Sequence, residues 1–317
     1  MATIGVLYPG EMGSALGRVL SGAGHRVVTT VAGRSTDTAD LATAAGLEML
    51  GSLEKVVAAS DVLLSLVPPA AAVSTARQAS ACDFKPDAIY VDANSIAPRT
   101  ARAIAEIVEG RGMQFVDAAI HGQSRQLPEH GIVYLSGGQA ATMGDLLEDI
   151  VKTRWLGCEP GRASAMKMLM GGLSKGLVGL FVELALAARE ASLLDEFLAG
   201  CGDWYPGVVA PVARMLPTYA RHAGRRAEEM SELEQTLRDL GLEPEVVVGI
   251  RRLTARLAET HLHQYALAVD HGLFEIDDLI EVIALDNPLG QCETAQHVGW
   301  DQRACERRPT EGDVVYG

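Results

Sequence analysis

The sequence predicts an α/β protein in which an N-terminal domain with a mostly parallel sheet, residues 1–160, is followed by an all-helical domain, residues 161–317. The length of 317 residues exceeds the roughly 250 to 300 residues that one hydrophobic core usually serves. Up to residue 157, short β-branched runs alternate with Ala-rich stretches, which is typical of βαβ units. From Ala163 onward the strand signal stops and only helical periodicity remains.

Seven short apolar runs are the expected strands of the first domain. In chain order they are Thr3–Leu7, Arg26–Val31, Val62–Val67, Ala88–Val91, Gln114–Ala119, Ile132–Ser136 and Thr153–Leu156. Helices are expected between the first four strands, at Ala15–Ala23, Asp37–Ala45, Leu53–Ala59 and Ala71–Ala81. The strands are apolar nearly throughout, as expected where helices cover both faces of a sheet.

In the helical half, Gly and Pro residues are expected to end the individual helices. These are Gly200, Gly202, Pro206, Pro217, Gly224, Gly241 and Gly272. The cationic run Tyr219–Arg226 is either an anion clamp or a partner for glutamates at helical spacing, which are Glu228, Glu229 and Glu232. Residues 287–317 show no clear period, so they form either a loosely ordered tail or a segment that packs on a partner subunit.

Composition and charge exclude several classes of protein. Twenty-seven Lys and Arg residues against 41 Asp and Glu residues give a net charge of −14, which repels nucleic-acid phosphates and anionic lipid. The five cysteines form no CxxC pair, and His261 and His263 suggest no third ligand, so no disulfide framework or metal site is expected. The apolar segment Gly176–Ala188 is too short to span a bilayer. Without a secretion signal, we expect a cytoplasmic protein with no nucleic-acid or membrane partner.

A Gly-rich turn follows the first expected strand and opens a helix. Four of its residues are candidates for binding the phosphates of a dinucleotide, namely Gly10, Glu11, Met12 and Gly13. Gly10 lets the backbone approach a pyrophosphate, Gly13 permits close packing of helix on strand, and N–H groups at the helix start attract the anion. Tyr8 stands where the GxGxxG pattern has its first glycine. The turn therefore predicts a Rossmann-like dinucleotide site, the alternative being a purely structural turn.

The end of the second expected strand indicates which dinucleotide binds. An NAD site places an acidic residue there for the ribose 2′-hydroxyl, but this chain has Arg34, Ser35 and Thr36 and no acid. A guanidinium bonds phosphate bidentately and stays charged, so the three residues predict a receptor for the 2′-phosphate of NADP. The alternative is that Arg34 is a solvated loop cation.

Several motifs resemble those of the β-hydroxyacid dehydrogenase superfamily, which includes 3-hydroxyisobutyrate dehydrogenase, the NAD-binding half of phosphogluconate dehydrogenase and imine reductases. In chain order the matching segments are Gly5–Gly13, Asp61–Pro68, Val91–Pro98, Asp117–Gly122 and Gly161–Lys167. The last is similar to the family's G-x-G-x-x-x-K at the start of a long inter-domain helix. The subgroup that the chain most resembles consists of phosphogluconate-dehydrogenase-like proteins of unassigned substrate.

The resemblance implies roles for individual residues. Lys167 matches the catalytic acid/base of the family, although Met170 and Gly171 stand where dehydrogenases usually carry Asn. On the cofactor side, the resemblance implies Val67, Pro68 and Asn94. On the substrate side, it implies Ser95, His121, Gly122 and Gln123. Asn94 and Ser95 are otherwise read as an Asx turn that closes a strand.

Two amines and a hydroxyl are expected on one face of the long helix. At 100° per residue, Gly171, Ser174 and Lys175 lie about 40°, 20° and 80° around the axis from Lys167. Lys175 is either an anchor for a substrate anion or a solvated lysine. His121 is a second proton carrier, a substrate handle or a polar residue that faces water.

Together these observations predict an NADP-dependent oxidoreductase that acts on a small hydroxy or oxo acid with Lys167 as general acid/base. The alternatives are an imine reductase and a non-catalytic NADP-binding protein. A homodimer is expected because the long helix is apolar on more than one face, with leucines at 169, 173, 177, 180 and 184. The substrate, anionic or with a carbonyl or imine group, is not identified by any residue.

Overall fold

The computed structural model describes residues 1–260, 262, 275–286 and 289. The expected break at Gly272, the histidines 261 and 263 and nearly all of the expected tail lie outside these residues. The chain forms two compact units, one of Met1–Gly176 with Arg225–Arg251 and the other of Leu177–Gly224 with Arg252–Gly317. The expected domain boundary at residue 160 falls in the loop before a long helix, whereas the compact units divide inside that helix.

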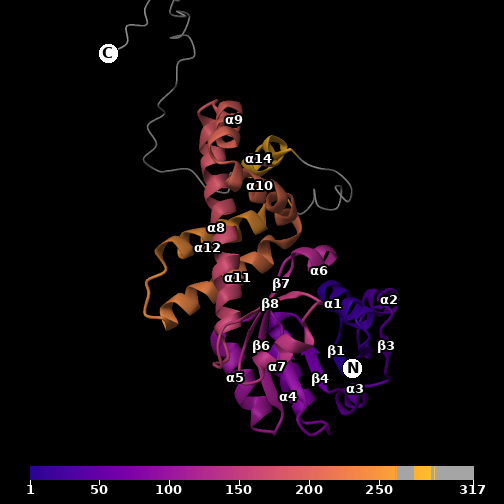
Figure 1. The fold of residues 1–317 in the computed structure, drawn as a ribbon. Coiled ribbons are helices and arrows are strands. Elements are labelled where there is room, and N and C mark those ends of the chain that lie inside the picture. Colours follow the sequence, from indigo (N-terminus) through magenta and orange to yellow (C-terminus); the bar gives the residue numbers. More distant parts are fainter. Residues whose placement is uncertain (261, 263–274, 287–288, 290–317) are drawn as a thin grey trace, which may run out of the picture. The chain divides into compact units, whose positions relative to one another are not determined.

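An eight-stranded sheet forms the centre of the first unit (Figure 1). Its strands are β1 (Thr3–Leu7), β2 (Arg26–Thr30), β3 (Glu48–Met49), β4 (Val62–Ser65), β5 (Ile89–Asp92), β6 (Gln114–His121), β7 (Ile132–Ser136) and β8 (Lys152–Trp155). Their order is β3-β2-β1-β4-β5-β6-β7-β8, and all neighbours are parallel except β6 and β7. The strand order reverses direction beside β1, so a ligand is expected at the carboxyl ends of β1 and β4.

All seven predicted strands are present, each within two residues of its expected bounds. The eighth, β3, was not predicted because its two residues are exposed and carry no apolar pattern. In the part of the chain that the structure describes, no strand follows β8. The prediction of an α/β half followed by a helical half is therefore confirmed.

Helices cover both faces of the sheet, as the apolar strands predicted. On one face lie α1 (Glu11–Gly22), α2 (Thr36–Ala44), α6 (Leu127–His130) and α7 (Ala140–Leu146), and on the other α3 (Leu53–Ala59), α4 (Ala72–Ser80) and α5 (Pro98–Glu109). Alternate residues of β1 enter opposite cores, with Ile4 and Val6 in the first and Leu7 in the second. Short 3-10 turns span Pro69–Ala71 and Ser124–Gln126.

Helices α5, α6 and α7 were not predicted from the sequence. In α5 the buried residues Ala101, Ile104, Ala105 and Val108 follow helical spacing. Pro98 occupies the first turn, where its missing N–H costs nothing. The signal for α5 was therefore in the sequence, whereas α6 and α7 are too short to show a period.

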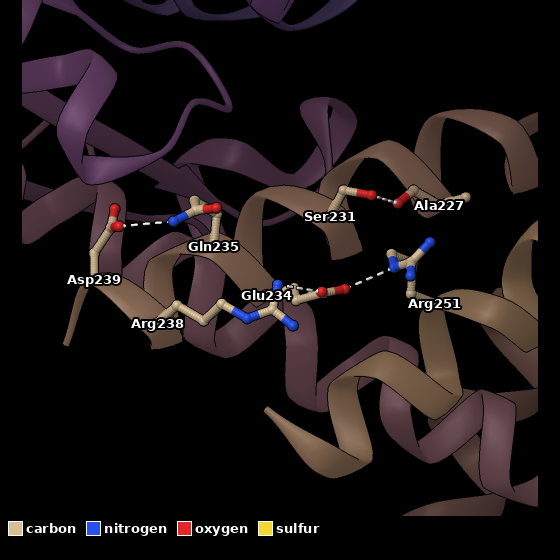
Figure 2. Close-up of polar contacts among 7 residues, drawn as sticks. All are labelled: Ala227, Ser231, Glu234, Gln235, Arg238, Asp239 and Arg251. Atoms are coloured by element: carbon tan, nitrogen blue, oxygen red, sulfur yellow. Dashed lines mark hydrogen bonds and ion pairs between the residues drawn. The ribbon is translucent and has the colours of Figure 1, made fainter. Parts of the chain in front are cut away.

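The first unit also contains parts of three longer helices, α8 (Arg162–Glu190), α11 (Tyr219–Asp239) and α12 (Glu245–Glu259). A small core joins them through Met168, Met230, Leu233 and Ile250. A Cβ at Gly172 would lie 2.1 Å from a methyl of Leu233, so any larger residue would force this side chain of α11 to shift away from α8. Glu234 of α11, 8% exposed, accepts hydrogen bonds from Arg238 and Arg251 and so ties α11 to α12 (Figure 2).

The second unit is helical throughout its described part. It contains α9 (Leu194–Trp204), α10 (Pro206–Met215), a 3-10 turn at Leu216–Thr218 and α14 (Ile276–Leu285), with segments of α8, α11 and α12. Its core includes Val178, Phe181, Leu216 and Ile280. Each helix therefore buries one apolar face against the others.

Some of the predicted helix ends were wrong. Gly200 and Gly202 lie inside α9 and Gly224 lies inside α11, so these glycines do not end helices. A glycine costs a helix only about 1 kcal/mol, which packing of an apolar face exceeds. The predictions at Pro206, which begins α10, and at Gly241, which has a φ of +76° just after α11, are confirmed.

Helix α8 carries an unusual amount of apolar surface. Its 29 residues are long and apolar enough, by length and composition alone, to cross a membrane, and 44% of the most apolar window is buried inside the protein. Four leucines on it are between 46% and 61% exposed, at positions 169, 173, 180 and 184. The spacing places them along one stripe of the helix, which we call the leucine stripe.

Candidate active site

The carboxyl ends of the central strands present a row of buried polar side chains. Ser65 of β4 is in register with Asp92 of β5, Asp92 with Asp117 of β6, and Asp117 with Ser136 of β7. All four are at most 1% exposed. The register therefore gathers in one row residues that lie up to 71 positions apart in the sequence, namely the ends of β4, β5 and the antiparallel β7 together with the middle of β6.

Asn94 bridges two strand ends at this edge. Its Oδ1 accepts a hydrogen bond from the N–H of Val67 at 2.6 Å, and its Nδ2 donates to Ser65 Oγ at 3.1 Å and to Asp92 Oδ2 at 2.8 Å. Asn94 is only 2% exposed. The amide thus fixes the loop that begins at Val67 relative to the end of β5, whatever further contact it makes with a ligand.

Asp92 is a buried acid whose ionisation is disfavoured. Burial raises its pKa to about 7, the hydrogen bonds from Asn94 lower the pKa, Asp117 raises it and Lys167 lowers it. The carboxyl is therefore partly protonated near neutral pH. Asp92 belongs to one of the matching motifs, but no role was predicted for it because a sequence does not show which carboxyl groups lose their solvation on folding.

Asp117 holds the start of α8. Its Oδ2 accepts hydrogen bonds from the N–H groups of Gly161 and Ser164 at 2.9 and 3.0 Å, and its Oδ1 accepts one from Ser164 Oγ at 2.6 Å. Ser136 Oγ donates to Asp117 and accepts from the N–H of Ala163 at 3.1 Å. A carboxylate at a helix N-terminus satisfies free donors and complements the helix dipole. Lys167, one turn further along, is thereby fixed relative to the sheet edge.

Lys167 is half-buried on α8, among charged groups from several elements. Burial lowers its pKa below the ordinary value of a lysine; Glu229 and Asp92 raise the pKa, and Lys175 and Arg225 lower it. A lysine with a lowered pKa exchanges a proton more readily near neutral pH than a solvated one does. The five groups lie together in the first unit, as the helical spacing of Lys167 and Lys175 predicted for those two.

Lys175 forms a buried ion pair with Glu229 of α11. Its Nζ lies 2.8 Å from Glu229 Oε2, with the two side chains 11% and 16% exposed, and it also donates to the carbonyl of Gly171 at 3.2 Å. Arg225 contacts the other oxygen of the same carboxylate at 3.0 Å. A Cβ at Gly171 would lie 3.0 Å from Lys175 Nζ, so glycine leaves the space that the ammonium occupies.

The pairing answers two questions that the sequence left open. Lys175 is not a solvated lysine, and within the cationic run Arg225 forms the expected ion pair with Glu229. Burial alone raises the pKa of Glu229, but Lys175, Arg225 and Lys167 lower it below its usual range. The carboxylate therefore stays charged among the three cations. Glu229 was noted in the sequence only as one of three alternative partners.

The Gly-rich turn has space for a ligand in front of α1. A Cβ at Gly10 would have no atom within 4 Å, whereas one at Gly13 would lie 3.4 Å from side-chain atoms of Pro9 and Val6. The turn is therefore open at Gly10 and closely packed at Gly13. Glu11 accepts a hydrogen bond from Ser124 in the loop after β6, and Met12 packs against the adjacent core. These features fit the phosphates of a dinucleotide at the start of α1.

Arg34 lies at the nucleotide end of the same sheet edge, in the turn between β2 and α2. Its guanidinium carbon stands 3.8 Å from the centre of the Tyr8 ring, and the residue is exposed. Ser35 caps α2, accepting a hydrogen bond from the N–H of Thr38 at 3.4 Å, and Thr36 is exposed in the first helical turn. The end of β2 therefore offers a guanidinium and no carboxylate, which fits a 2′-phosphate.

The other predicted residues lie around these two ends. His121, Gly122 and Gln123 are exposed where β6 ends, and Gly122 has a φ of +136°. Ser95 is half-buried beside Asn94, Pro68 is exposed after Val67, and Ser174 donates to the carbonyl of Met170 at 3.1 Å. In the described part of the chain no group of three metal-ligating side chains occurs.

Comparison with known proteins agrees with this arrangement. Residues 3–153 match the NAD binding domain of 6-phosphogluconate dehydrogenase, and residues 188–257 match a domain of unknown function, DUF1932. A solved conserved protein of unknown function, described as structurally similar to 3-hydroxyacid dehydrogenases, is 30% identical with a TM-score of 0.66, and the match covers 83% of this chain and 99% of that one. The chain belongs to the β-hydroxyacid dehydrogenase superfamily.

Two further proteins match 89% of this chain. A probable 3-hydroxyisobutyrate dehydrogenase of Mycobacterium tuberculosis is 25% identical over 299 residues, which is 89% of this chain and 98% of that protein. A reductive aminase of Aspergillus terreus, solved in complex with NADPH and ethyl levulinate, is 20% identical with a TM-score of 0.54, covering 89% of this chain and 99% of that one. The superfamily resemblance predicted from the sequence motifs is therefore confirmed.

Proposed function

We propose that this protein is an NADP(H)-dependent oxidoreductase that transfers a hydride between the cofactor and a small hydroxy or oxo acid, with Lys167 as the proton carrier. The observation that carries the proposal is the position of Lys167, half-buried near the start of α8 in a cluster with Asp92, Glu229, Lys175 and Arg225, where burial lowers its pKa. Hydride transfer to a carbonyl carbon leaves an alkoxide that must gain a proton. The nicotinamide supplies the hydride and this chain supplies the proton.

Lys167 suits both directions of the reaction. As an ammonium it polarises a carbonyl oxygen and donates a proton during reduction, and as a neutral amine it accepts the proton of an alcohol during oxidation. Because burial lowers its pKa, the neutral amine forms at a lower pH than it does for a solvated lysine. The contact of Asp117 with the start of α8 keeps the helix, and with it Lys167, in a fixed position relative to the sheet edge.

The charges around Lys167 favour an anionic substrate. Lys175 and Arg225 share the single carboxylate of Glu229, so these three groups carry one positive charge in excess. A substrate carboxylate would compensate that charge. Lys175, held by Glu229 and the Gly171 carbonyl, is the group that we assign to this role.

The NADP assignment depends on Arg34. The mycobacterial relative is named a probable 3-hydroxyisobutyrate dehydrogenase, and the fungal structural neighbour was solved with NADPH. In this chain, Arg34 supplies a cation and β2 ends without an acid that would hold a ribose 2′-hydroxyl. Charge-assisted hydrogen bonds are worth about 1.5 to 3 kcal/mol, so losing them weakens binding by about tenfold or more.

Titration of the purified protein with NADPH and NADH tests the cofactor. We expect tighter binding of NADPH, and at least a tenfold loss of NADPH affinity in Arg34→Ala with little change for NADH. Equal affinities for the two cofactors would contradict the assignment. Consumption of NADPH, followed by absorbance against panels of oxo acids, aldehydes and imines, then tests the substrate class. Turnover of imines alone would indicate an imine reductase. NADPH binding without turnover of any compound would favour a non-catalytic NADP-binding protein.

We further propose that the protein is a homodimer in which the leucine stripe of α8 is covered. Leu173 and Leu180 are 61% and 55% exposed, more than a soluble monomer usually leaves along one helix. Sedimentation at micromolar concentration should give twice the chain mass of 33.6 kDa. The double variant Leu173→Glu with Leu180→Glu should shift the protein toward monomer. A wild-type monomer would contradict this proposal and leave the cofactor assignment untouched.

A further inference from the structure

Tyr8 adopts a backbone conformation that is rare for its residue type. It follows the last residue of β1 and has a φ of +49°, in the left-handed region that normally favours glycine. The dinucleotide-binding pattern has glycine at this position, so the turn keeps the geometry of the pattern but adds a large side chain. A non-glycine residue in this region is strained, and such strain persists only where surrounding contacts hold it.

The Tyr8 ring is held between the core and Arg34. On one side it is half-buried and packs against the cluster that contains Leu7, Val28 and Val67. On the other side the Arg34 guanidinium carbon lies 3.8 Å from the ring centre, within the range of a cation–π contact. Because the ring packs on the core at the sheet edge, it restrains the Arg34 side chain, which would otherwise be free to move.

The backbone of Arg34 is also fixed. Gly33, with a φ of +73°, turns the chain after β2, and the N–H of Arg34 donates to the carbonyl of Val31 at 3.0 Å. Ser35 then caps α2 through its hydrogen bond from Thr38. Both residues of the pair are therefore held in place: Tyr8 packs on the core, and Arg34 lies in a short turn that hydrogen bonds fix.

Stacking leaves the hydrogen-bonding edge of the guanidinium available. The guanidinium carbon lies over the Tyr8 ring at 3.8 Å from its centre, and the five N–H donors of a guanidinium are arranged around the edge of the planar group. Among the described residues, no ion pair or side-chain hydrogen bond engages Arg34. A phosphate binds a guanidinium through that edge, often with two parallel hydrogen bonds. The contact with Tyr8 therefore orients Arg34, and the side-chain N–H groups of Arg34 remain available to bind an anion.

We infer that Tyr8 is a positioning residue that holds Arg34 ready for the 2′-phosphate of NADP and so determines the preference for NADPH over NADH. The inference rests on the proposed NADP specificity and goes beyond it, since that proposal concerns Arg34 alone. Binding a flexible arginine costs side-chain entropy, and a residue that restrains it beforehand removes part of that cost. The substitution of the pattern's glycine by tyrosine then has a function.

The test separates the adenosine end of the cofactor from catalysis. Calorimetric titrations use 2′,5′-ADP and 5′-AMP, which differ only in the 2′-phosphate, together with NADPH and NADH. The variants are Tyr8→Phe, which keeps the ring, Tyr8→Leu, which keeps only its bulk, Tyr8→Gly, which restores the pattern, and Arg34→Ala. Affinity for 5′-AMP and NADH reports whether each variant retains a folded nucleotide site.

We expect Tyr8→Leu and Tyr8→Gly to weaken binding of NADPH and 2′,5′-ADP by about fivefold to tenfold, with NADH and 5′-AMP changed less than about twofold. Tyr8→Phe should bind within about twofold of the wild type because the ring and its cation–π contact remain. In the double variant of Tyr8→Leu with Arg34→Ala, the loss should not exceed that of Arg34→Ala alone, since the two residues act through one contact.

Different results would overturn different conclusions. A wild type without preference for NADPH overturns the NADP assignment and the role of Tyr8 with it. A preference that is lost in Arg34→Ala but retained in Tyr8→Leu and Tyr8→Gly overturns only the role of Tyr8. Tighter binding of both NADPH and NADH by Tyr8→Gly would also overturn it, because the ring would then obstruct the nucleotide and not position its receptor.

Discussion

The candidate site has two ends that use charge in opposite ways: the nucleotide end, formed by Tyr8 and Arg34, and the amine end, formed by Lys167, Lys175 and Glu229. At the nucleotide end, Arg34 is exposed, stacked on Tyr8 and without a carboxylate among the described residues. At the amine end, Lys175 and Glu229 are 11% and 16% exposed and paired at 2.8 Å, and the pKa of the neighbouring Lys167 is lowered by burial. The nucleotide end therefore presents to solvent a cation that has no ion-pair partner among the described residues. The amine end instead buries several charged groups that interact with one another.

The difference indicates what each end can do. An exposed guanidinium keeps its charge and contributes affinity for an anion, with little influence on folding. Buried groups lose solvation, so their pKa values move and their partners become necessary for stability. We therefore expect substitutions at the nucleotide end to change ligand affinity, and substitutions at the amine end to change turnover, pH dependence and stability. The following predictions test that division, starting with the largest effect.

Replacing Lys167, the proposed proton carrier, should have the largest effect. Lys167→Ala should lower kcat by about 10²-fold or more while NADPH affinity stays nearly intact, since general acid/base catalysis contributes about 10² to 10⁴. Lys167→Arg should not restore turnover because a guanidinium retains its proton. The measurements are kcat and NADPH affinity on the same preparations, with His121→Ala and Lys175→Ala as controls. Near wild-type turnover in Lys167→Ala would move the proton transfer to one of those residues or to the substrate.

Removing the shared carboxylate should reduce stability as well as turnover. Glu229→Gln leaves Lys175 buried without its counterion, which should lower the free energy of unfolding by about 3 kcal/mol. Glu232→Gln in the same helix is the matched control, because its contact with Arg99 at 3.9 Å is half exposed and should be worth less than about 0.5 kcal/mol. Urea unfolding measures the free energy of unfolding of both variants. Equally small losses would show that the Glu229 ion pair contributes no more to stability than an exposed one.

The same variant should shift the pH dependence of turnover. The Glu229 carboxylate raises the pKa of Lys167, so its removal lowers that pKa further. In the proposed mechanism reduction requires protonated Lys167, so its rate should decline at a lower pH in Glu229→Gln than in the wild type. An unchanged profile in a folded variant would show that Glu229 does not act on Lys167.

Asp92 should make stability fall as pH rises. Its pKa is about 7 in the folded protein, whereas an unfolded Asp titrates near 4, so the folded state binds more protons between these values. Stability is then greatest below pH 4 for this group and is lost as pH rises toward 7, by on the order of 2 kcal/mol between pH 5 and 7. Unfolding curves at several pH values should show a flatter dependence for Asp92→Asn. A wild-type slope that the variant retains would assign the effect to other groups.

The smallest expected effect concerns the helix contact behind the amine end. Gly172→Ala places a Cβ against Leu233, which is 4% exposed, and should cost about 1 to 2 kcal/mol of stability. Gly176→Ala in the same helix meets no atom within 4 Å and should instead gain about 0.5 to 1 kcal/mol. Thermal unfolding distinguishes the two signs. Stabilisation by both substitutions would mean that α8 and α11 pack less closely than the structure indicates.

Much of the fold was predictable from the sequence because its causes are local. β-branched runs between Ala-rich stretches predicted seven of the eight strands, and β3 was missed because two exposed residues form no pattern. The Gly-rich turn and the position of Lys167 near the start of α8 followed from motifs a few residues long. Gly200, Gly202 and Gly224 were misread as helix ends because tertiary packing outweighs the modest helix propensity of glycine.

Patterns a few residues long were thus enough to predict the α/β architecture, the dinucleotide turn with Arg34 beyond it, and the helical face shared by Lys167 and Lys175. The folded chain was needed to show that Glu229 pairs with Lys175, that Asp92 lies buried beside Asp117, and that the Tyr8 ring contacts Arg34. The reason is physical: secondary structure follows from periodicity and turn chemistry over a few residues. Ion pairs, stacking and pKa values depend instead on which distant residues meet and on how much water is excluded where they do.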